Sequence, residues 1–332
     1  MAVSNDLRLH PAISEVRAAV RRFLTAHQTG DVVAVACSGG ADSLALAAAT
    51  VHCAGRLGVA VHGLVVDHGL QPGSGPVAQT AAEELRGLGC TVVGVLQTTV
   101  EGPGGPEAAA RRARYAALRA ATPAGALVLL GHTLDDQAET VLLGLGRGSG
   151  PRSVAGMREL AVPWGRPLLG VRRAVTAAAC GALGLVPWVD PHNADPRFQR
   201  VRLRTEVLPL LEDVLAGGVA PALARTASQL QEDLDLLDRQ ADALLAQALD
   251  VAGLDVAGSD VAGLDVTVLA QAPATLRRRA LRRWLLDAGV TELTDAHLRV
   301  ADDLIGRWAG QGAVRLPGDV DLFRAHGRLQ LS

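Results

Sequence analysis

Lysine is absent from this sequence of 332 residues, so all 32 of its basic residues are arginine. A Walker A loop needs a lysine on the phosphates, a Schiff-base enzyme needs a lysine amine, and a protein kinase needs a lysine on one of its strands. The sequence excludes these three classes. If the protein binds ATP, it uses a different phosphate-binding device.

Cysteine and aromatic residues are also scarce. The four cysteines lie far apart without a CxxC pair, which argues against a zinc ribbon, an iron–sulfur site or a disulfide framework and favours a reducing cytosol. No apolar run reaches the roughly 18 residues of a membrane span, and the N-terminus lacks the apolar region of a signal peptide. We therefore expect a cytoplasmic protein without a membrane span, whose core consists mainly of Val, Leu and Ala.

Acidic charge is concentrated in one segment. The net charge is −2, yet residues 232–265 hold nine acidic residues and one arginine. The rest of the chain has 31 basic and 25 acidic residues, a balance that suits a polyanionic partner. Residues 250–265 repeat a unit of five residues, DVAGL or DVAGS, whose Gly and Asp break both helix and strand. We predict a flexible, low-complexity insertion without a chemical role there.

Short apolar segments alternate with helical ones in the first half. This alternation predicts an α/β fold, with a parallel sheet covered by helices on both faces and ligands bound beyond the carboxyl ends of the strands. Three polar clusters fall at those ends, at residues 38–43, 67–68 and 132–140. The predicted strands are residues 31–36, 60–66, 91–99 and 126–130, and the predicted helices are residues 43–54, 76–88, 107–121 and 133–145, with Gly89 as a C-cap.

The second half is expected to be mainly helical. We divide the chain into an N-terminal helix (residues 1–29), a catalytic domain (30–215) and a helical domain (216–332) that contains the insertion. In the last domain, Thr294 is expected to cap a helix that begins at Asp295. Residues 314–332 are expected to form a hairpin around Pro317-Gly318-Asp319.

The first polar cluster is Ser38-Gly39-Gly40-Ala41-Asp42-Ser43, between a predicted strand and a predicted helix. Glycines let a ligand approach the backbone closely, and a helix N-terminus favours an anion. Asp42 would repel a bare phosphate unless a cation lies between them, so the loop suits a polyphosphate with Mg²⁺. The alternative is a glycine-rich turn that only reverses the chain.

The segment GHTLDDQAET, residues 131–140, carries the second pattern. On a helix that begins near Thr133, Asp136, Glu139 and Thr140 share one face, with His132 at its entrance. This face suits a cationic amine and a carboxylate that accepts its proton. The alternative is that these residues only cap the start of the helix, because Thr133 and Asp136 also resemble a capping box.

Arginines gather in three further places. Taken alone, the helix that contains RRARY (111–115) is better explained as an exposed surface with a Glu107–Arg111 pair. The other two clusters are either solvated faces or sites for phosphates and base edges. They comprise Arg197, Arg200, Arg202 and Arg204, and then Arg277, Arg278, Arg279, Arg282 and Arg283.

The motifs together resemble one family. SGGxDS is similar to the signature of the PP-loop (N-type) ATP pyrophosphatases. It is followed in order by DHGL (67–70), ARxxRY (110–115), GHTxDDQxET, RGSG (147–150), RPLL (166–169) and a DPxNxD run that leads into arginines (190–204). This order resembles the tRNA(Ile)-lysidine synthetases over residues 30–211. The resemblance implies a PP-loop, adenine nucleotide alpha hydrolase-like domain followed by a mainly helical C-terminal domain.

The resemblance also implies a reaction. ATP adenylates the C2 oxygen of the wobble cytidine in an isoleucine tRNA with the anticodon CAU, and free L-lysine then displaces AMP. The implied catalytic residues are Asp42, Arg111, Asp136 and Glu139, with Asp136 and Glu139 on the lysine and Asp42 on Mg²⁺. The implied ATP-binding residues are Ser38, Gly39, Gly40, Ala41, Asp42, Ser43, His68, Arg114 and His132, and the implied tRNA-binding residues are Arg197, Arg200, Arg202, Arg204, Arg278, Arg279 and Arg282. A homodimer is one assembly that we consider.

Several rivals are less consistent with the sequence. A tRNA 2-thiocytidine synthetase would need cysteine pairs, and a GMP synthetase would normally bring a glutaminase. Argininosuccinate and NAD synthetases lack the RGSG and DPxNxD runs. A non-catalytic RNA-binding protein with a relic nucleotide pocket is disfavoured because the loop at residues 38–43 is intact.

Overall fold

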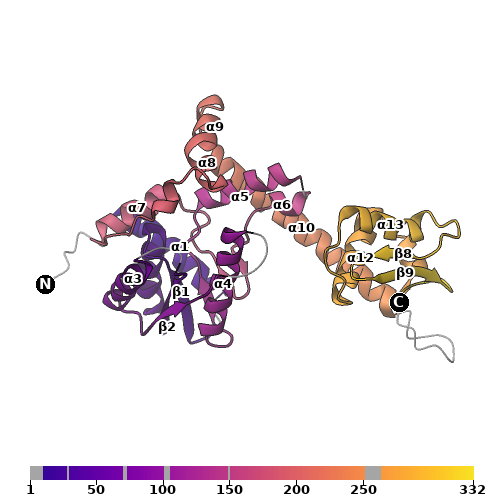
Figure 1. Cartoon of the computed structure of the whole chain (residues 1–332), viewed down its shortest axis with the longest axis horizontal. Coiled ribbons are helices and arrows are strands. Elements are labelled where there is room, and N and C mark those ends of the chain that lie inside the picture. The colour runs from indigo at the N-terminus through magenta and orange to yellow at the C-terminus, as the bar shows by residue number, and fades with distance from the viewer. Residues whose placement is uncertain (1–9, 28–29, 70–72, 101–104, 149, 251–262) are drawn as a thin grey trace. The chain divides into compact units, whose positions relative to one another are not determined.

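The chain divides into two units, one up to Gln229 and the other from Leu230 to the end. The structure, a computed structural model shown in Figure 1, describes residues 10–27, 30–69, 73–100, 105–148, 150–250 and 263–332. The division falls within a long helix, α10 (Val219–Asp250). The domain boundary expected at residues 215 and 216 lies just before this helix.

The first unit is built on a six-stranded sheet with the order β3-β2-β1-β4-β6-β5. All neighbouring strands pair in parallel except β5 and β6, which are antiparallel. The expected parallel α/β sheet is therefore confirmed, with one short antiparallel strand added at its edge. The strands are β1 (Val32–Cys37), β2 (Ala60–Asp67), β3 (Val92–Gln97), β4 (Leu127–Leu129), β5 (Leu160–Ala161) and β6 (Trp164–Gly165).

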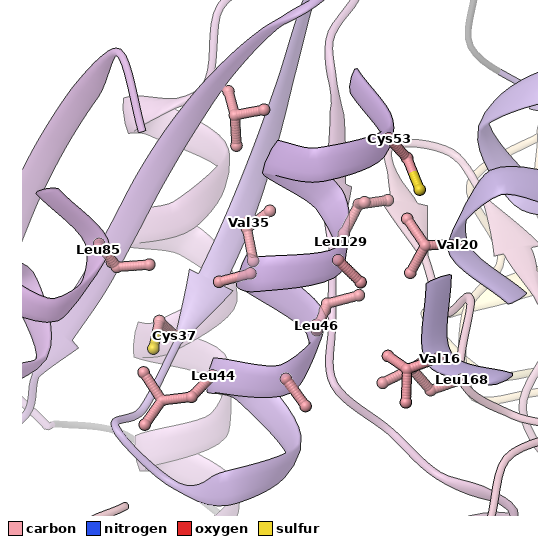
Figure 2. Close-up of a cluster of buried hydrophobic side chains, with 14 of the residues drawn as sticks. Val16, Val20, Val35, Cys37, Leu44, Leu46, Cys53, Leu85, Leu129 and Leu168 are labelled. Carbon is pink, nitrogen blue, oxygen red and sulfur yellow. The ribbon is translucent and has the colours of Figure 1, made fainter. Parts of the chain in front are cut away.

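Side chains alternate along β1 between two cores, one on each face of the sheet. Val33, Val35 and Cys37 pack with α1, α2, α3 and α7, whereas Ala34 and Ala36 pack with α4. This period of two is what a strand buried on both faces requires. Figure 2 shows part of the first core, in which Val16 and Val20 of α1, Leu44, Leu46 and Cys53 of α2 and Leu85 of α3 gather around Val35 and Leu129. The helices of this unit are α1 (Pro11–His27), α2 (Ala41–Ala54), α3 (Ser74–Leu88), α4 (Pro106–Ala121), α5 (Leu134–Arg147), α6 (Pro151–Val154), α7 (Arg173–Ala182), α8 (Gln199–Arg202) and α9 (Leu208–Val214).

Gly144 allows α5 and α6 to approach closely. A Cβ atom added at Gly144 would lie 2.6 Å from the carbonyl carbon of Ser153 and would overlap its oxygen. Gly144→Ala is therefore expected to lower the free energy of unfolding by about 2 kcal/mol, since overpacking displaces backbone. Gly146, on the same helix, is the matched control, because an added Cβ there meets no described atom within 4 Å. Urea unfolding should show that Gly146→Ala is at least as stable as the wild type, and equal losses for both variants would contradict this account.

The second unit packs helices against a four-stranded antiparallel sheet with the order β7-β10-β9-β8. The predicted hairpin is confirmed between β8 and β9, and β10 extends it. Thr294 caps α13 through a capping box with His297, as predicted for its N-cap position. The remaining elements are β7 (Leu264–Asp265), β8 (Val314–Leu316), β9 (Val320–Ala325), β10 (Arg328–Leu331), α11 (Val266–Ala270), α12 (Ala274–Asp287) and α13 (Asp295–Gly306).

The end of the five-residue repeat corrects one prediction. Residues 251–262 lie outside the described part of the chain, but Leu264 and Asp265 form β7, so the repeat is not without structure throughout. Leu264 is fully buried in the core of this unit. The carboxylate of Asp265 accepts hydrogen bonds from the backbone N–H groups of Thr267 and Val268 and caps α11. The repeat therefore ends in a residue pair that packs and caps, which its composition conceals.

Among the described residues, no single helix has the length and apolar character needed to cross a membrane. One pair of helices, Gln199–Val214 and Val219–Leu249, passes together on length and composition alone, with a bend of 95° between them.

Candidate active site

The three polar clusters predicted from the sequence meet at one cavity of about 630 Å³. They lie together because β1 pairs in parallel with both β2 and β4, so that the carboxyl ends of these three strands are neighbours. The cavity is large enough for a nucleotide. The predicted residues that line it are Ser38, Gly40, Ala41, Asp42, Ser43, His68, Arg114, His132, Asp136 and Arg204.

The loop between β1 and α2 is tied together by the hydroxyl of Ser43. This hydroxyl accepts a hydrogen bond from the backbone N–H of Ser38 at 3.2 Å and donates one to the carbonyl of Gly40 at 2.9 Å. Gly39 has φ +80°, a conformation that favours glycine, whereas Gly40 has φ −75° and precedes the helix in an extended conformation. Residues Ala41, Asp42 and Ser43 of the first turn of α2 line the cavity, and the first N–H groups of a helix have no partner within it, as an anion site requires.

Three carboxylates, which we call the acid cluster, lie beside this loop: Asp42 on α2 and Asp136 and Glu139 on α5. Asp136 is also the capping residue that the sequence allowed, because its Oδ2 accepts hydrogen bonds from the backbone N–H and the hydroxyl of Thr133 at 2.7 and 2.8 Å. Asp136 therefore caps the helix and also lines the cavity, so it fits both explanations of this segment, helix capping and ligand binding. Its Oδ1 faces away from the cap.

Glu139 occupies a different position from the one expected. Its side chain is 0% exposed, and it is absent from the described residues that line the cavity. Its carboxylate lies 2.9 Å from Nε of Arg204, 3.2 Å from Nη2 of Arg173 and 3.7 Å from Nη1 of Arg200. Glu139 is thus held behind the cavity wall by arginines.

Arg173, at the start of α7, is the main residue that the sequence motifs did not reveal. Its guanidinium contacts the whole acid cluster, with Nη2 2.6 Å from Asp136 and 3.2 Å from Glu139 and Nε 3.7 Å from Asp42. Thr176, one turn further along α7, donates a hydrogen bond to Asp42. Because α7 lies some thirty residues beyond the nearest predicted carboxylate, no local spacing in the sequence could indicate these contacts.

Burial and arginine act in opposite directions on the acid cluster. Burial raises the pKa of Asp42 above its ordinary value, despite the hydrogen bond from Thr176 and the charge of Arg173. Burial also acts to raise the pKa of Asp136, but Arg173 and the hydrogen bonds from Thr133 hold that pKa below its ordinary value. Asp136 is therefore a firmly ionised carboxylate. The ionised form of Asp42 is less favourable, and an incoming cation would stabilise it.

A second group of polar side chains, His68, Arg114 and His132, lines the same cavity. Burial lowers the pKa of His132 to about 3, so the imidazole is neutral at physiological pH. Nδ1 of His132 and Nε of Arg114 are buried and have no hydrogen-bond partner among the described residues. Burial also lowers the pKa of His68, whose Nδ1 lies 3.2 Å from the hydroxyl of Thr98. These groups offer polar contacts to a ligand in the cavity.

Arg111 and Arg114 take different positions on α4. Arg114 lines the cavity, whereas Arg111 is exposed and is absent from the described lining residues. Arg111 donates a hydrogen bond to the hydroxyl of Tyr115 and its guanidinium lies 4.8 Å from the centre of that ring. The alternative pair between Arg111 and Glu107 concerns a side chain outside the described residues.

The four arginines at 197–204 separate into two kinds. Arg200 and Arg204 point into the first unit and reach Glu139. Arg197 and Arg202 are 81% and 61% exposed and pair with Asp195 and Glu206 on the surface. Only the exposed two therefore have the position of a solvent-facing phosphate contact.

The arginines of α12 also differ among themselves. Arg279 lies 2.6 Å from Asp238, and Nη1 of Arg282 donates to the carbonyl of Leu293 at 3.2 Å. Arg277 forms a largely buried pair with Asp302. Part of this basic run therefore stabilises the second unit.

Trp188 is a further wall residue that the sequence analysis did not single out. Its backbone N–H donates to the carbonyl of Gly39 at 2.9 Å, which fixes the segment against the phosphate loop. Trp188 is the one tryptophan among the described residues lining the cavity, and it is 37% exposed. An indole in this place is suited to stack on a nucleobase.

The carboxylates near the loop fit Mg²⁺ only as part of a larger set of ligands. No group of three or more His, Cys, Asp or Glu side chains in the described part of the chain could hold a metal ion by itself. Mg²⁺, however, commonly takes one or two protein carboxylates and completes its shell with phosphate oxygens and water. Asp42 fits the role of one such carboxylate, because it lies in a phosphate-type loop at the cavity and burial raises its pKa.

Comparison with known families covers most of the chain. Residues 13–211 match the PP-loop domain family, and residues 264–330 match the TilS substrate binding domain family. The first match contains the loop at 38–43, the acid cluster and the arginines at 197–204. The second contains α12, α13 and the four-stranded sheet.

Whole-length relatives are also found. A tRNA(Ile)-lysidine synthase of Nocardia farcinica is 57% identical over 323 residues, which cover 95% of this chain and 97% of that protein. One of Rhodococcus erythropolis is 55% identical over 308 residues, with 93% and 90% covered. One of Mycobacterium tuberculosis is 56% identical over 304 residues, with 91% and 90% covered.

Among solved structures, a similar fold occurs in the U34-tRNA thiolase NcsA of Methanococcus maripaludis. The TM-score is 0.56, the identity is 19%, and the match covers 67% of this chain and 80% of that one. This likeness concerns the fold alone.

Proposed function

Since the chain belongs to the tRNA(Ile)-lysidine synthase family, we propose that it ligates free L-lysine to C2 of the wobble cytidine of the isoleucine tRNA whose anticodon is CAU. ATP first adenylates the C2 oxygen of the base and releases pyrophosphate. The ε-amine of lysine then attacks C2, and the oxygen leaves with AMP. The product pairs with A instead of G, so that decoding changes from AUG to AUA.

One observation carries the proposal: an anion-binding loop and an ionised carboxylate line the same cavity. Ser38–Ser43 supply backbone N–H groups and hydroxyls, which suit the pyrophosphate that departs from ATP. Asp136 supplies a carboxylate, which suits the ammonium of lysine before it loses its proton. The two reactive partners of the second step can therefore be held in one space.

The ATP contacts that we propose come from side chains that line the cavity. We assign the triphosphate to the loop and to Arg114, whose side chain lines the same cavity. His132 is neutral and offers a hydrogen bond instead of a charge. Asp42 would hold Mg²⁺, which when bound to the phosphates neutralises the charge that develops on them. Arg111 would act from outside the cavity wall, by adding to the positive potential around Arg114.

Lysine recognition is assigned to Asp136, with Glu139 behind it as the residue that holds Arg204 and Arg173 in place. Asp136→Asn is expected to raise the KM for lysine about a hundredfold, because a charge-assisted hydrogen bond worth roughly 3 kcal/mol is lost. The KM for ATP should change little. Initial rates of lysidine formation at varied lysine and ATP test this split.

Asp135→Asn is the matched control for that variant. Asp135 carries the same side chain one position earlier, binds Arg172 and the backbone N–H of Arg173, and is absent from the described lining of the cavity. We expect small and similar changes in both KM values. A raised KM for ATP in Asp136→Asn with an unchanged KM for lysine would reverse the assignment.

The tRNA contacts are proposed for two exposed arginines of the first unit and three partly buried arginines of the second. Arg197 and Arg202 are surface-paired and can exchange their carboxylate partners for phosphates. In the second unit, Arg278, Arg279 and Arg282 belong to the segment that matches the substrate binding domain, and we propose that they contact the tRNA. Arg279 and Arg282 also make the contacts within the second unit that are described above.

ATP–pyrophosphate exchange tests the first step. Exchange that depends on the isoleucine tRNA is expected, because the acceptor of the adenylate is a base of that tRNA. Exchange of equal rate without tRNA would contradict adenylation of the base.

A further inference from the structure

Arg173 occupies the position that a cationic substrate needs. Its Nη2 lies 2.6 Å from Oδ1 of Asp136, and the other oxygen of that carboxylate is committed to Thr133. Oδ1 is therefore the atom of Asp136 that can receive an ammonium. In the structure, this atom already has a cation.

The neighbouring carboxylate offers no alternative place. Glu139 is 0% exposed, and Arg204 and Arg200 hold it as well as Arg173. An amine that enters the cavity must therefore compete for Asp136 with Arg173, whose Nη2 is the nearer cation at 2.6 Å from Oδ1, while Nη2 of Arg204 lies 4.0 Å from the same oxygen. The inference rests on the proposed assignment of lysine to this residue.

The side chain of Arg173 can move while its backbone stays fixed. Its backbone N–H donates to Asp135 at 2.7 Å, and Arg172 pairs with the same carboxylate at 3.0 Å, so the start of α7 is fastened to α5. The side chain is 26% exposed and lines the cavity. A long arginine on an anchored backbone is a movable charge.

The same cavity offers that charge a second destination. Nε of Arg173 is 3.7 Å from Asp42, which belongs to the phosphate-type loop. A bound triphosphate would place several negative charges beside this loop and attract the guanidinium away from Asp136. We propose that Arg173 is a gate: it fills the ammonium site of the empty enzyme and leaves that site when the nucleotide binds.

The consequence is a coupling between two ligands. A ligand that favours one of two side-chain positions changes the affinity of the other ligand by the same factor in both directions. Lysine should bind weakly to the enzyme alone and about tenfold more tightly when nucleotide is present, a factor within the usual range for coupled sites. The gate would keep other amines out of the site until ATP is in place.

Isothermal titration of the full chain with L-lysine, in the presence and absence of Mg²⁺ and the ATP analogue AMPPNP, tests the gate. Wild type should show the tenfold difference. In Arg173→Met, lysine should bind the nucleotide-free enzyme more tightly than in wild type, and the difference should fall towards onefold. Arg173→Lys keeps a cation and should keep most of the coupling.

Arg172→Met is the matched control, since its side chain is a neighbouring arginine that pairs with Asp135 and is absent from the described cavity lining. It should retain the coupling, because the hydrogen bond from the backbone N–H of Arg173 to Asp135 remains to anchor α7. A merely structural role of Arg173 would instead weaken lysine binding with and without nucleotide alike. If Arg173→Met does not fold, wild-type lysine affinity that is unchanged by nucleotide would still overturn the gate.

Two results would overturn the gate. One is wild-type lysine affinity that is unchanged by nucleotide, and the other is full coupling in Arg173→Met. Either result in an enzyme that forms lysidine would leave the proposed reaction intact. Absence of lysidine formation by wild type would instead contradict the proposed function.

Discussion

Asp42→Asn is expected to lower the rate of lysidine formation about a thousandfold, equivalent to roughly 4 kcal/mol of transition-state stabilisation. Asp42 is the only carboxylate in the loop Ser38–Ser43 and the residue we assign to Mg²⁺. An amide is a far weaker ligand for this cation, and the charge that develops on the phosphates would lose its partner. Single-turnover measurements with saturating ATP, lysine and tRNA would measure the loss.

Folding should not confound this result. Burial raises the pKa of Asp42, so the ionised carboxylate is less favourable in the folded chain than in the unfolded one. Removing the charge therefore relieves a penalty at neutral pH, and Asp42→Asn should unfold no more easily than wild type. Thr176→Val, which removes only the hydrogen-bond donor to Asp42, is the control and should stay within tenfold of wild type. An Asp42→Asn enzyme as active as that control would refute the metal assignment.

Glu139→Gln is expected to give the largest loss of stability, about 3 kcal/mol in the free energy of unfolding. The carboxylate is 0% exposed and faces Arg173, Arg200 and Arg204, so its neutralisation takes one buried anionic partner from three partly buried guanidinium groups. The three arginines are between 26% and 36% exposed, which places the loss at the lower end of the range for buried pairs. Urea unfolding monitored by circular dichroism would measure it.

Glu206→Gln provides the comparison. Glu206 lies on the segment that also carries Arg204 and pairs with Arg202, but both of these paired side chains are about half exposed or more. An exposed pair of this kind contributes little to stability, so the variant should unfold like wild type. Equal losses in the two variants would mean that burial does not set the cost.

The framework of the first unit could be predicted because its signals are local. The continuous apolar run Val32–Cys37, the small residues of Ala41–Ala54 and the glycine-bearing loop between them are each recognised from a few consecutive residues. The meeting of the three polar clusters also followed, because parallel strands bring their carboxyl ends to one edge.

The roles within the acid cluster could not be read in the same way. Spacing of three residues places Asp136 and Glu139 on one face of α5, but it does not say which of them another element will cover. That is decided by Arg204 and Arg173, which arrive from distant parts of the chain. The same limit applies to Arg111 and Arg114, because the rotation of α4 against the sheet decides which one lines the cavity.

In the second unit, a helix cap and a turn could be predicted from the sequence, whereas the packing of the core could be predicted less well. Thr294 and the turn at residues 317–319 carry local signals, and both predictions are confirmed. Leu264 lies at the end of a repetitive acidic segment, yet it joins the sheet through Leu329, more than sixty residues away. A pairing over that distance leaves no trace in the repeat itself.

Incubation of the protein with ATP, labelled lysine and each of two tRNAs tests the central claim most directly. One is the isoleucine tRNA with the anticodon CAU, and the other is the methionine tRNA with the same anticodon. Label is expected in the isoleucine tRNA alone, together with release of AMP and pyrophosphate in equal amounts. Label in neither tRNA, or in both to the same extent, would contradict it.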